Sequence, residues 1–273
     1  MPEKGYESIE LRVVDGVATI TFNLPQFGNA LNLKGVQETL DALYKSEART
    51  DVGAIVLTGR GKAFCSGFNL KEIPAGELDV EKMSAHFRVL AMWWHQVLHL
   101  ITRVRKPVLA AVNGVAAGSG LGMTLCADLA VCKDTARFLP AWHTIGLAND
   151  ATTSYSLVKI VGFRRAMEWM MTNRTVDARE ALEMNLVNRV YGEASFDKNV
   201  ASIARQLADG PTHLQAMAKE GFHSGWRRSI EEATEFEIQN VMQSVAHPYF
   251  ADSLKKFLAG ERKSSQAQVT LPD

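Results

Sequence analysis

A glycine-rich segment constrains this chain more than any other feature. Residues 113–122 read NGVAAGSGLG and follow directly on an apolar run at 108–112, with a helix-like pattern beginning at Leu121. Small residues there let a ligand oxygen approach the backbone, and the amino end of a helix offers free N–H groups with about half a positive charge. The segment therefore predicts a site that polarises an oxygen atom.

Three other interpretations of this segment exist, of which two are disfavoured and one stays open. A dinucleotide-binding loop is disfavoured because Met123 stands where the GxGxxG pattern needs its third glycine. A phosphate-binding P-loop is disfavoured because the chain contains no GKS or GKT. A tight turn that needs glycine for packing alone stays open on these residues.

Strand-like and helix-like segments alternate through the first 150 residues. Two β-rich runs within 9–23 are joined by Asp15 and Gly16, a strong signal for a hairpin. Alternating strand and helix patterns predict an α/β fold with layered helices and strands. Helices are expected at 33–46, 81–104 and 121–127, and strands at 53–57, 108–112 and 129–132.

The carboxyl third of the chain is expected to be helical. From Ala151 onward the strand signals nearly vanish, and Gly210 with Pro211 interrupts the helical pattern. We place the domain boundary there, with a core domain at 1–209 and a helical carboxyl-terminal region at 210–273. The expected helices lie around 151–172, 178–185, 196–208 and 212–260.

Composition indicates a chain that packs a core and binds a small ligand. Hydrophobic residues make up 47% of the 273 residues and charged residues 22%, which are ordinary globular values. Thirty lysines and arginines balance thirty aspartates and glutamates, so the formal net charge is zero. A chain without an overall positive field is not expected to bind nucleic acid or an anionic membrane surface.

Several features favour a cytoplasmic protein without a metal. The first ten residues carry acids where a signal peptide needs an apolar run. The segment from Val89 to Val104 is interrupted by polar side chains and falls short of the ~20 apolar residues of a membrane span. Three cysteines without a CxxC pair favour reduced thiols. The seven histidines form no HExxH pattern and no cluster with cysteine, so no metal site is expected.

A second segment, residues 61–71, indicates a function only when it is considered together with residues 113–122. Residues 61–71, GKAFCSGFNLK, indicate by themselves a strand and a turn. Together with residues 113–122 they resemble the crotonase (enoyl-CoA hydratase/isomerase) superfamily, whose members carry AFxxGxxL and NGxxxGGG in this order. The resemblance implies a crotonase-type coiled βαβ core, a helical carboxyl-terminal trimerisation region and an acyl-coenzyme A thioester substrate. It also implies an oxyanion hole formed by the backbone N–H groups of Phe68 and Ser119, although Ser119 replaces the middle glycine of the triplet.

Hydratases of this superfamily place two glutamates around the thioester, at positions held here by Gly122 and Trp142. Neither position carries a carboxylate in this chain. Without an acid and a base, water cannot be added across a double bond by that mechanism. The sequence therefore disfavours a hydratase.

Aromatic, histidine and aspartate residues form a third group of candidates. Phe87 and Trp94 share one helical stripe, with His95 at its edge. From the residues alone, the stripe is a packed core, His95 is a hydrogen-bonded interior histidine and Asp150 is the N-cap of a helix beginning near Ala151. These simpler interpretations stay open.

The wider pattern resembles one branch of the superfamily, the 4-chlorobenzoyl-CoA dehalogenases. The segments carrying this resemblance are WWHQ, AWHTIG, ND, FHSG, HPYF and FLAGER, spread along nearly the whole chain. It implies that Asp150 is a nucleophile, that His95 is the base of a second step, and that Trp142 donates a hydrogen bond that orients Asp150. Further implied residues are Phe68, Phe87 and Trp94 around an aromatic ring, and Ser66, Lys71 and Arg262 at coenzyme A, whereas Gly28 stands where an arginine is expected.

The function implied by this resemblance is hydrolytic dehalogenation of 4-chlorobenzoyl-CoA to 4-hydroxybenzoyl-CoA and chloride through an aryl ester on Asp150. A homotrimer is expected, with no cofactor beyond the coenzyme A of the substrate. Another crotonase-type enzyme, such as an enoyl-CoA isomerase in which Asp150 shuttles a proton, is the alternative. A non-catalytic protein that binds RNA or another protein is disfavoured by the absence of a basic face.

Overall fold

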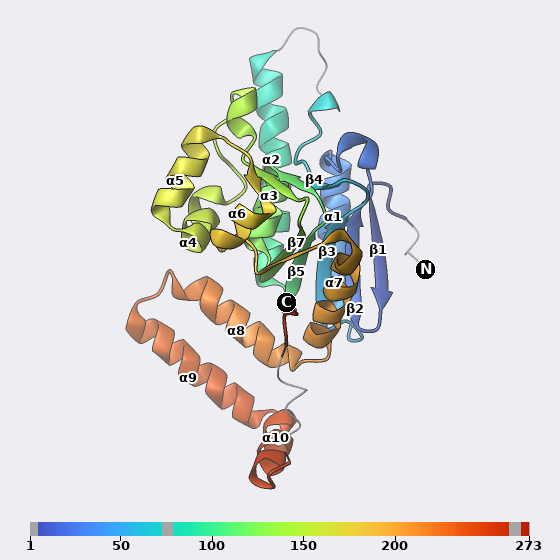
Figure 1. Ribbon diagram of the computed structural model, residues 1–273. Helices are drawn as coiled ribbons and strands as arrows, with labels where there is room; N and C mark the ends of the chain where they lie inside the picture. Colours follow the sequence, from blue (N-terminus) through green and yellow to red (C-terminus); the bar gives the residue numbers. More distant parts are fainter. Residues whose placement is uncertain (1–4, 73–78, 262–268, 273) are drawn as a thin grey trace.

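The chain forms two β-sheets covered by helices (Figure 1). This computed structural model describes residues 5–72, 79–261 and 269–272. The larger sheet has the strand order β1-β2-β3-β5-β7-β10 and the smaller one β4-β6-β8-β9. The strands are β1 Ile9–Val14, β2 Val17–Phe22, β3 Ala54–Gly59, β4 Ala63–Cys65, β5 Val108–Val112, β6 Val115–Ala117, β7 Leu129–Lys133, β8 Arg137–Leu139, β9 Val176–Asp177 and β10 Arg189–Tyr191.

The amino-terminal hairpin is confirmed. Strands β1 and β2 pair antiparallel, with Val14 opposite Val17. Asp15 (φ 49°) and Gly16 (φ 77°) both adopt the left-handed conformation that a two-residue type I′ turn requires. The remaining neighbours in the larger sheet pair in parallel, so the predicted α/β architecture is also confirmed.

Helices provide the crossovers between the parallel strands. Helix α1 (Leu33–Ala48) joins β2 to β3, and α2 (Val80–Arg103) precedes β5. Asp79 caps α2 by accepting hydrogen bonds from the backbone N–H groups of Glu81 and Lys82. The apolar stripe of α2 is buried, as its spacing predicts. Its buried members include Leu90, Trp94, Leu98 and Ile101.

The carboxyl third contains more breaks than the sequence indicates. The helix expected at 151–172 is interrupted at Gly162 (φ 83°). Before this glycine lie η4 (Thr153–Leu157) and α4 (Val158–Val161), and after it lies α5 (Phe163–Thr172). Strands β9 and β10 were not expected, because two or three residues are too few to show alternation. The helices that follow are α6 Ala178–Glu183, α7 Glu193–Ala208, α8 Thr212–Gly225, α9 Ile230–Ala246 and α10 Pro248–Leu258.

The prediction of one helical segment at 212–260 is wrong, because the structure has three separate helices there, α8, α9 and α10. Ser229 begins α9 with a capping box that it forms with Glu232. His247 and Pro248 end α9 and begin α10, because proline is favoured in the first turn of a helix and cannot continue one. The break expected at Gly210 and Pro211 is present between α7 and α8. The assignment of 210–273 as a separate oligomerisation region stays a prediction.

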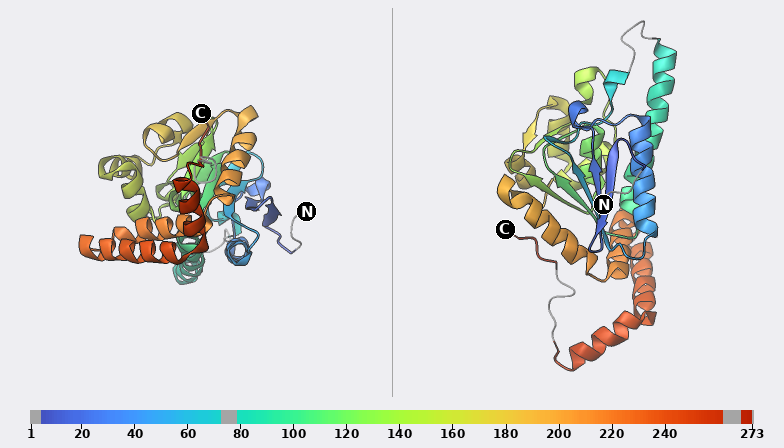
Figure 2. Two further views of the ribbon diagram at one scale, coloured as in Figure 1. Left: turned by 90° about the horizontal axis from the view of Figure 1, so that it is seen from below. Right: turned by 90° about the vertical axis from the view of Figure 1, so that its right-hand side faces the viewer.

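Helices α8, α9 and α10 form an arm that extends away from the sheets (Figures 1 and 2). Helix α8 is held to the core by Lys219, whose ammonium group donates to the backbone oxygens of Ile101 (2.7 Å) and Lys106 (3.2 Å). The same group pairs with the carboxylate of Asp128 at 2.8 Å. Helix α9 has no buried residues and exposes apolar side chains such as Val241. No helix in the described ranges is both long enough and apolar enough for a transmembrane span.

Candidate active site

Two backbone turns meet at the edge of the smaller sheet. Strands β4 and β6 run parallel, with Cys65 opposite Ala116, so the turns that follow them leave the sheet side by side. A Cβ built on Gly67 (φ +93°) would lie 3.2 Å from the backbone nitrogen of Ser119. The two motifs recognised in the sequence are therefore in contact, with Phe68 following one turn and Ser119 the other.

The backbone N–H groups of Phe68 and Ser119 donate no hydrogen bond to any other residue in the described part of the chain. Ser119 is the first residue of α3 (Ser119–Cys126), where the N–H groups have no partner within the helix. The backbone of Gly118 (φ 52°, ψ −123°) lies in a region that residues with side chains avoid. A Cβ on Gly120 would overlap the carbonyl oxygen of Cys65. The glycines thus allow close packing and leave two N–H groups available.

Neither position that carries a glutamate in hydratases can supply a carboxylate here. A Cβ on Gly122 would lie 2.6 Å from the Cβ of Ala151, so even the first atom of a side chain does not fit. Trp142 begins the short helix η3 (Trp142–Ile145) and is buried in the apolar core. At Gly122 the absence of a carboxylate is thus a consequence of packing, and at Trp142 the position is filled by a buried indole.

Asp150 and His95 are in direct contact. The Nε2 atom of His95, on α2, lies 2.6 Å from Oδ1 of Asp150, in the turn before η4. The two side chains are 41% and 28% exposed, respectively. The structure thereby brings together the two residues proposed for successive chemical steps, which are 55 positions apart in the sequence.

The interpretation of Asp150 as a helix cap is wrong. Thr152, in the left-handed conformation (φ 64°), occupies the N-cap position, and η4 begins at Thr153. The backbone oxygen of Asp150 accepts hydrogen bonds from Thr153, while its carboxylate is directed to His95 instead. Ala151 (φ 54°) is also left-handed. Two consecutive non-glycine residues in this conformation are costly, and such strain is concentrated at functional sites.

The contact shifts the pKa values of both groups in favour of an ion pair. The hydrogen bond that His95 donates to the Asp150 carboxylate raises the pKa of His95 above its ordinary value, with burial opposing the shift. Burial is the largest influence on Asp150 and favours its neutral form. The hydrogen bonds from His95 and from the backbone of Ala151, with the charge of His95, outweigh it and hold the pKa of Asp150 below its ordinary value. The carboxylate is therefore ionised at neutral pH.

Aromatic side chains gather beside the free N–H groups. The ring of Phe68 lies 5.9 Å from that of Trp94 and 6.2 Å from that of Phe87, between ring centroids. Trp94 is fully buried, and its indole Nε1 has no hydrogen-bond partner among the described residues. The three residues expected to surround an aromatic ring thus form one cluster that contains an unused donor.

The expected role of Trp142 in orienting Asp150 is not visible in this conformation. Within the ranges that the structure describes, no hydrogen bond joins the indole of Trp142 to the carboxylate of Asp150. The carboxylate is held by His95 instead. A role for Trp142 stays a prediction.

Two of the residues expected at coenzyme A lie close to one loop. The hydroxyl of Ser66 donates to the backbone oxygen of Gly28 at 3.0 Å, and the ammonium of Lys71 lies 5.7 Å from the ring centre of Phe27. Gly28 is left-handed (φ 62°), and a Cβ there would lie 3.1 Å from the Ser66 hydroxyl, so the arginine expected at this position would strain the backbone. Arg262 lies outside the described residues.

Within those same ranges, no three histidine, cysteine, aspartate or glutamate side chains are placed to hold a metal ion. The prediction that the reaction needs no metal and no separate cofactor stays untested by this geometry.

One residue beside the site was missed. The ring of His99 lies 6.4 Å from that of His95, centroid to centroid, one helical turn further along α2. Burial is the largest cause of the lowered pKa of His99, and the charges of Arg103 and His95 act in the same direction. The spacing of four residues between His95 and His99 was the available signal, since residues four apart lie on one face of a helix.

A protein-family model, two relatives and a solved structure are similar to this chain over most of its length. The family model described as enoyl-CoA hydratase/isomerase matches residues 12–266. Two proteins of Arthrobacter sp., named 4-chlorobenzoyl coenzyme A dehalogenase-1 and -2, are each 51% identical over 263 residues, covering 96% of this chain and 95% of each relative. The crystal structure of an enoyl-CoA hydratase from Mycobacterium smegmatis superimposes with a TM-score of 0.84 at 28% identity, covering 96% of this chain and 99% of that one.

Proposed function

The chain belongs to the enoyl-CoA hydratase/isomerase family, and we propose that it converts 4-chlorobenzoyl-CoA to 4-hydroxybenzoyl-CoA and chloride. The observation that carries this proposal is the 2.6 Å contact between His95 and Asp150 in a site that has no room for a carboxylate at Gly122. The 51% identity to two proteins named as 4-chlorobenzoyl-CoA dehalogenases supports the choice of substrate.

The first task is to draw electrons out of the chlorinated ring. A benzene ring resists nucleophilic attack because the incoming electron pair must enter its π-system. The thioester carbonyl opposite the chlorine can accept that charge when its oxygen is held by the N–H groups of Phe68 and Ser119. One such donor is typically worth ~3 kcal/mol of transition-state stabilisation. The positive end of α3 adds to the same effect.

The second task is the displacement of chloride. A carboxylate oxygen of Asp150 forms a bond to the chlorine-bearing carbon, and the C–Cl bond breaks with its electron pair remaining on chloride. Asp150 needs no base for this step because its pKa is held below the ordinary carboxyl value. The rings of Phe68, Phe87 and Trp94 exclude water around the reacting ring, which keeps the field of the N–H groups unscreened.

The third task is hydrolysis of the aryl ester on Asp150. Esterification removes the hydrogen-bond acceptor and the negative charge that raise the pKa of His95, and it breaks the ion pair. His95 can then lose its proton and act as a base. It takes a proton from a water molecule that attacks the carboxyl carbon of the ester. The bond between that carbon and the aryl oxygen breaks, so the new hydroxyl oxygen comes from Asp150.

The remaining parts of the proposal concern binding, assembly and location. We assign Ser66, Lys71 and Arg262 to the coenzyme A part of the substrate, and no cofactor beyond that part. The exposed apolar residues of α9 and α10, such as Val241 and Phe257, support a homotrimer assembled through the carboxyl-terminal helices. The three cysteines are free and buried, which supports a reducing cytoplasm as the site of action.

The test is to incubate the protein with 4-chlorobenzoyl-CoA and to measure free chloride and 4-hydroxybenzoyl-CoA in parallel. Crotonyl-CoA serves as the comparison substrate for an enoyl-CoA enzyme. Activity on crotonyl-CoA with none on the chlorinated thioester would overturn the proposal. A single turnover in water enriched in oxygen-18 tests the covalent step, because the first product should carry an unlabelled hydroxyl oxygen from Asp150.

A further inference from the structure

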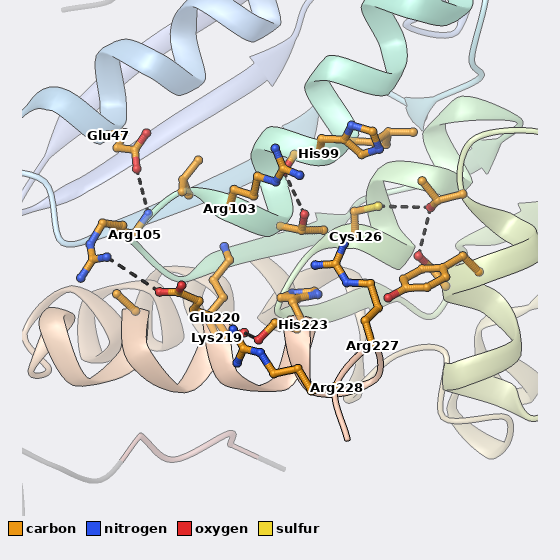
Figure 3. A pocket seen from close by; sticks show the side chains of 18 residues that line it. Glu47, His99, Arg103, Arg105, Cys126, Lys219, Glu220, His223, Arg227 and Arg228 are labelled. Carbon is orange, nitrogen blue, oxygen red and sulfur yellow. Dashed lines mark hydrogen bonds and ion pairs between the residues drawn. The ribbon is translucent and has the colours of Figure 1, made fainter. Parts of the chain in front are cut away.

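A cavity lies one helical turn beyond His95 on α2, away from the loop that carries Ser66 and Lys71. It has a volume of about 770 Å³ and lies between the carboxyl end of α2, the end of α3, η4 and α8 (Figure 3). A water molecule takes about 30 Å³ of liquid volume, so the cavity is large enough to hold a hydrated ion. We call it the basic pocket.

The basic pocket adjoins the Asp150–His95 pair. His99 lines the pocket, and its ring lies 6.4 Å from that of His95, centroid to centroid. Thr152 also lines it, two residues beyond Asp150, with its hydroxyl 3.3 Å from the Cys126 sulfur. His99 and Thr152 therefore connect the lining of the pocket to the elements that carry His95 and Asp150, although neither His95 nor Asp150 lines it.

Positive charge dominates the lining of the basic pocket. Five lysine or arginine side chains line it, against two glutamates. Lys219 is neutralised by Asp128 at 2.8 Å, and Arg105 lies 3.9 Å from Glu220. The other three cations, Arg103, Arg227 and Arg228, remain without an acidic partner among the described residues.

Two of these arginines face the pocket from opposite walls. Figure 3 shows Arg103 on α2 beside His99, and Arg227 reaching from beyond the end of α8 toward Cys126. Neither guanidinium makes a hydrogen bond or an ion pair with another described residue. Arg228 is different, since its guanidinium lies 3.9 Å from the ring centre of Phe236. A hollow lined by unneutralised charge of one sign concentrates counter-ions.

The proposed reaction needs an exit for an anion at this point. When Asp150 displaces chloride, the aryl group and its coenzyme A remain attached to the protein and still fill the path by which they entered. Chloride must leave, and a water molecule must arrive, before the thioester can depart. A pocket near Asp150 that favours anions and lies away from the coenzyme A path would meet both needs.

We propose that the basic pocket binds the released halide and is the route by which chloride leaves and water reaches the ester. This inference rests on the proposed function. The alternative occupant, a phosphoryl group of coenzyme A, is disfavoured because Ser66 and Lys71 lie beside Phe27, and none of these three residues lines the pocket.

The test compares Arg103→Gln/Arg227→Gln with the wild-type protein. Arg164→Gln is the matched control, because Arg164 is an exposed arginine on α5 outside the pocket. Line broadening of the chloride NMR signal reports bound chloride without any substrate. We expect saturable broadening in the wild type and in Arg164→Gln. In the double variant, chloride binding and product inhibition by chloride should both weaken about fivefold or more, from the loss of two modest charge interactions.

Three results would overturn the proposal: no saturable broadening in the wild type, equal broadening in the double variant, or complete displacement by an equal concentration of phosphate. The last would assign the pocket to phosphoryl groups.

The proposed function and the proposed exit route fail in different ways. Chloride release from 4-chlorobenzoyl-CoA with arginine-independent chloride binding overturns only the exit route. Arginine-dependent chloride binding without chloride release from the substrate overturns the proposed function and the exit role together.

Discussion

Asp150 and His95 share a 2.6 Å hydrogen bond in the free protein, although they are proposed to act in different steps. The contact holds the pKa of Asp150 below its ordinary value and raises the pKa of His95, so it favours the ionised carboxylate and the protonated imidazole. In the proposed mechanism this ion pair sets the order of the two steps, because formation of the ester removes the partner that favours protonation of His95.

The first prediction concerns loss of the nucleophile. Asp150→Asn retains the size of the side chain but removes the negative charge and the nucleophilic oxygen. Chloride release should fall by about 10³-fold or more, comparable to the loss of other covalent nucleophiles. Single-turnover chloride measurements check this. Retention of more than a tenth of the wild-type rate would show that water attacks the ring directly.

The second prediction separates the base from the nucleophile. His95→Gln should still release about one equivalent of chloride per active site but should form 4-hydroxybenzoyl-CoA about 10²–10⁴-fold more slowly, the range for a lost general base. Intact-protein mass spectrometry should show the aryl group on Asp150. Normal turnover by this variant would remove His95 from the mechanism.

The third prediction concerns pH. The raised pKa of His95 stabilises the fold below the unfolded value of ~6.5, and this contribution is lost as pH rises through the folded pKa. The lowered pKa of Asp150 stabilises the fold above ~3.9, and this is lost as pH falls through its folded pKa. The melting temperature of the wild type should therefore exceed that of His95→Gln most between about pH 4 and 6.5. A constant difference across pH 4–9 would contradict this ion pair.

In an NMR titration, the folded pKa of His95 should lie above ~6.5 in the wild type and should drop in Asp150→Asn. Both side chains are partly exposed, so the shift is expected to shrink as salt is added. An unchanged His95 titration in Asp150→Asn would mean that the contact contributes nothing in solution.

The fourth prediction concerns the glycine that lets β4 and α3 meet. Gly120→Ala places a Cβ onto the Cys65 carbonyl and should destabilise the fold by about 2–3 kcal/mol while shifting the Ser119 N–H. Gly225→Ala is the matched control, since nothing lies within 4 Å of a Cβ there. Denaturant unfolding of both variants checks this. Equal stabilities would contradict the close approach.

The fifth prediction concerns the attachment of the carboxyl-terminal arm. Lys219→Met removes the ammonium group 2.8 Å from the Asp128 carboxylate and leaves only His223, 3.6 Å away, as its basic partner in the described part of the chain. The change should cost about 3 kcal/mol, the lower end for breaking a buried pair. Amide exchange in α8 should rise more than in α1. The double variant Lys219→Met/Asp128→Asn should recover part of the loss, and failure to recover any would assign the effect to packing.

The sequence predicts the local elements well where the signals are long. The hairpin at Asp15 and Gly16 and the buried stripe of α2 follow from turn chemistry and helical spacing, and both are confirmed. The two short strands of the carboxyl third, Val176–Asp177 and Arg189–Tyr191, could not be predicted, because they are stabilised by pairing with distant strands.

The sequence predicts the members of the site better than their arrangement. The glycine-rich turn and the apolar strand before it indicate an oxygen-polarising site around Ser119, and the structure leaves that N–H group available. The contact between His95 and Asp150 is followed directly by left-handed conformations at Ala151 and Thr152, which neither residue type favours. The basic pocket could not be predicted from the sequence either, because Arg103 and Arg227 are 124 positions apart.

The left-handed pair Ala151–Thr152 bears on attempts to transfer this chemistry to a related hydratase scaffold. Introducing an aspartate alone would not be enough, because the following turn decides where its carboxylate points. The smallest useful transfer is the loop that contains Asp150 and Ala151, together with a glycine at the position of Gly122 on α3, which makes space for Ala151. A designer would do better to transplant residues 142–153 as a block and measure whether chloride is released at all.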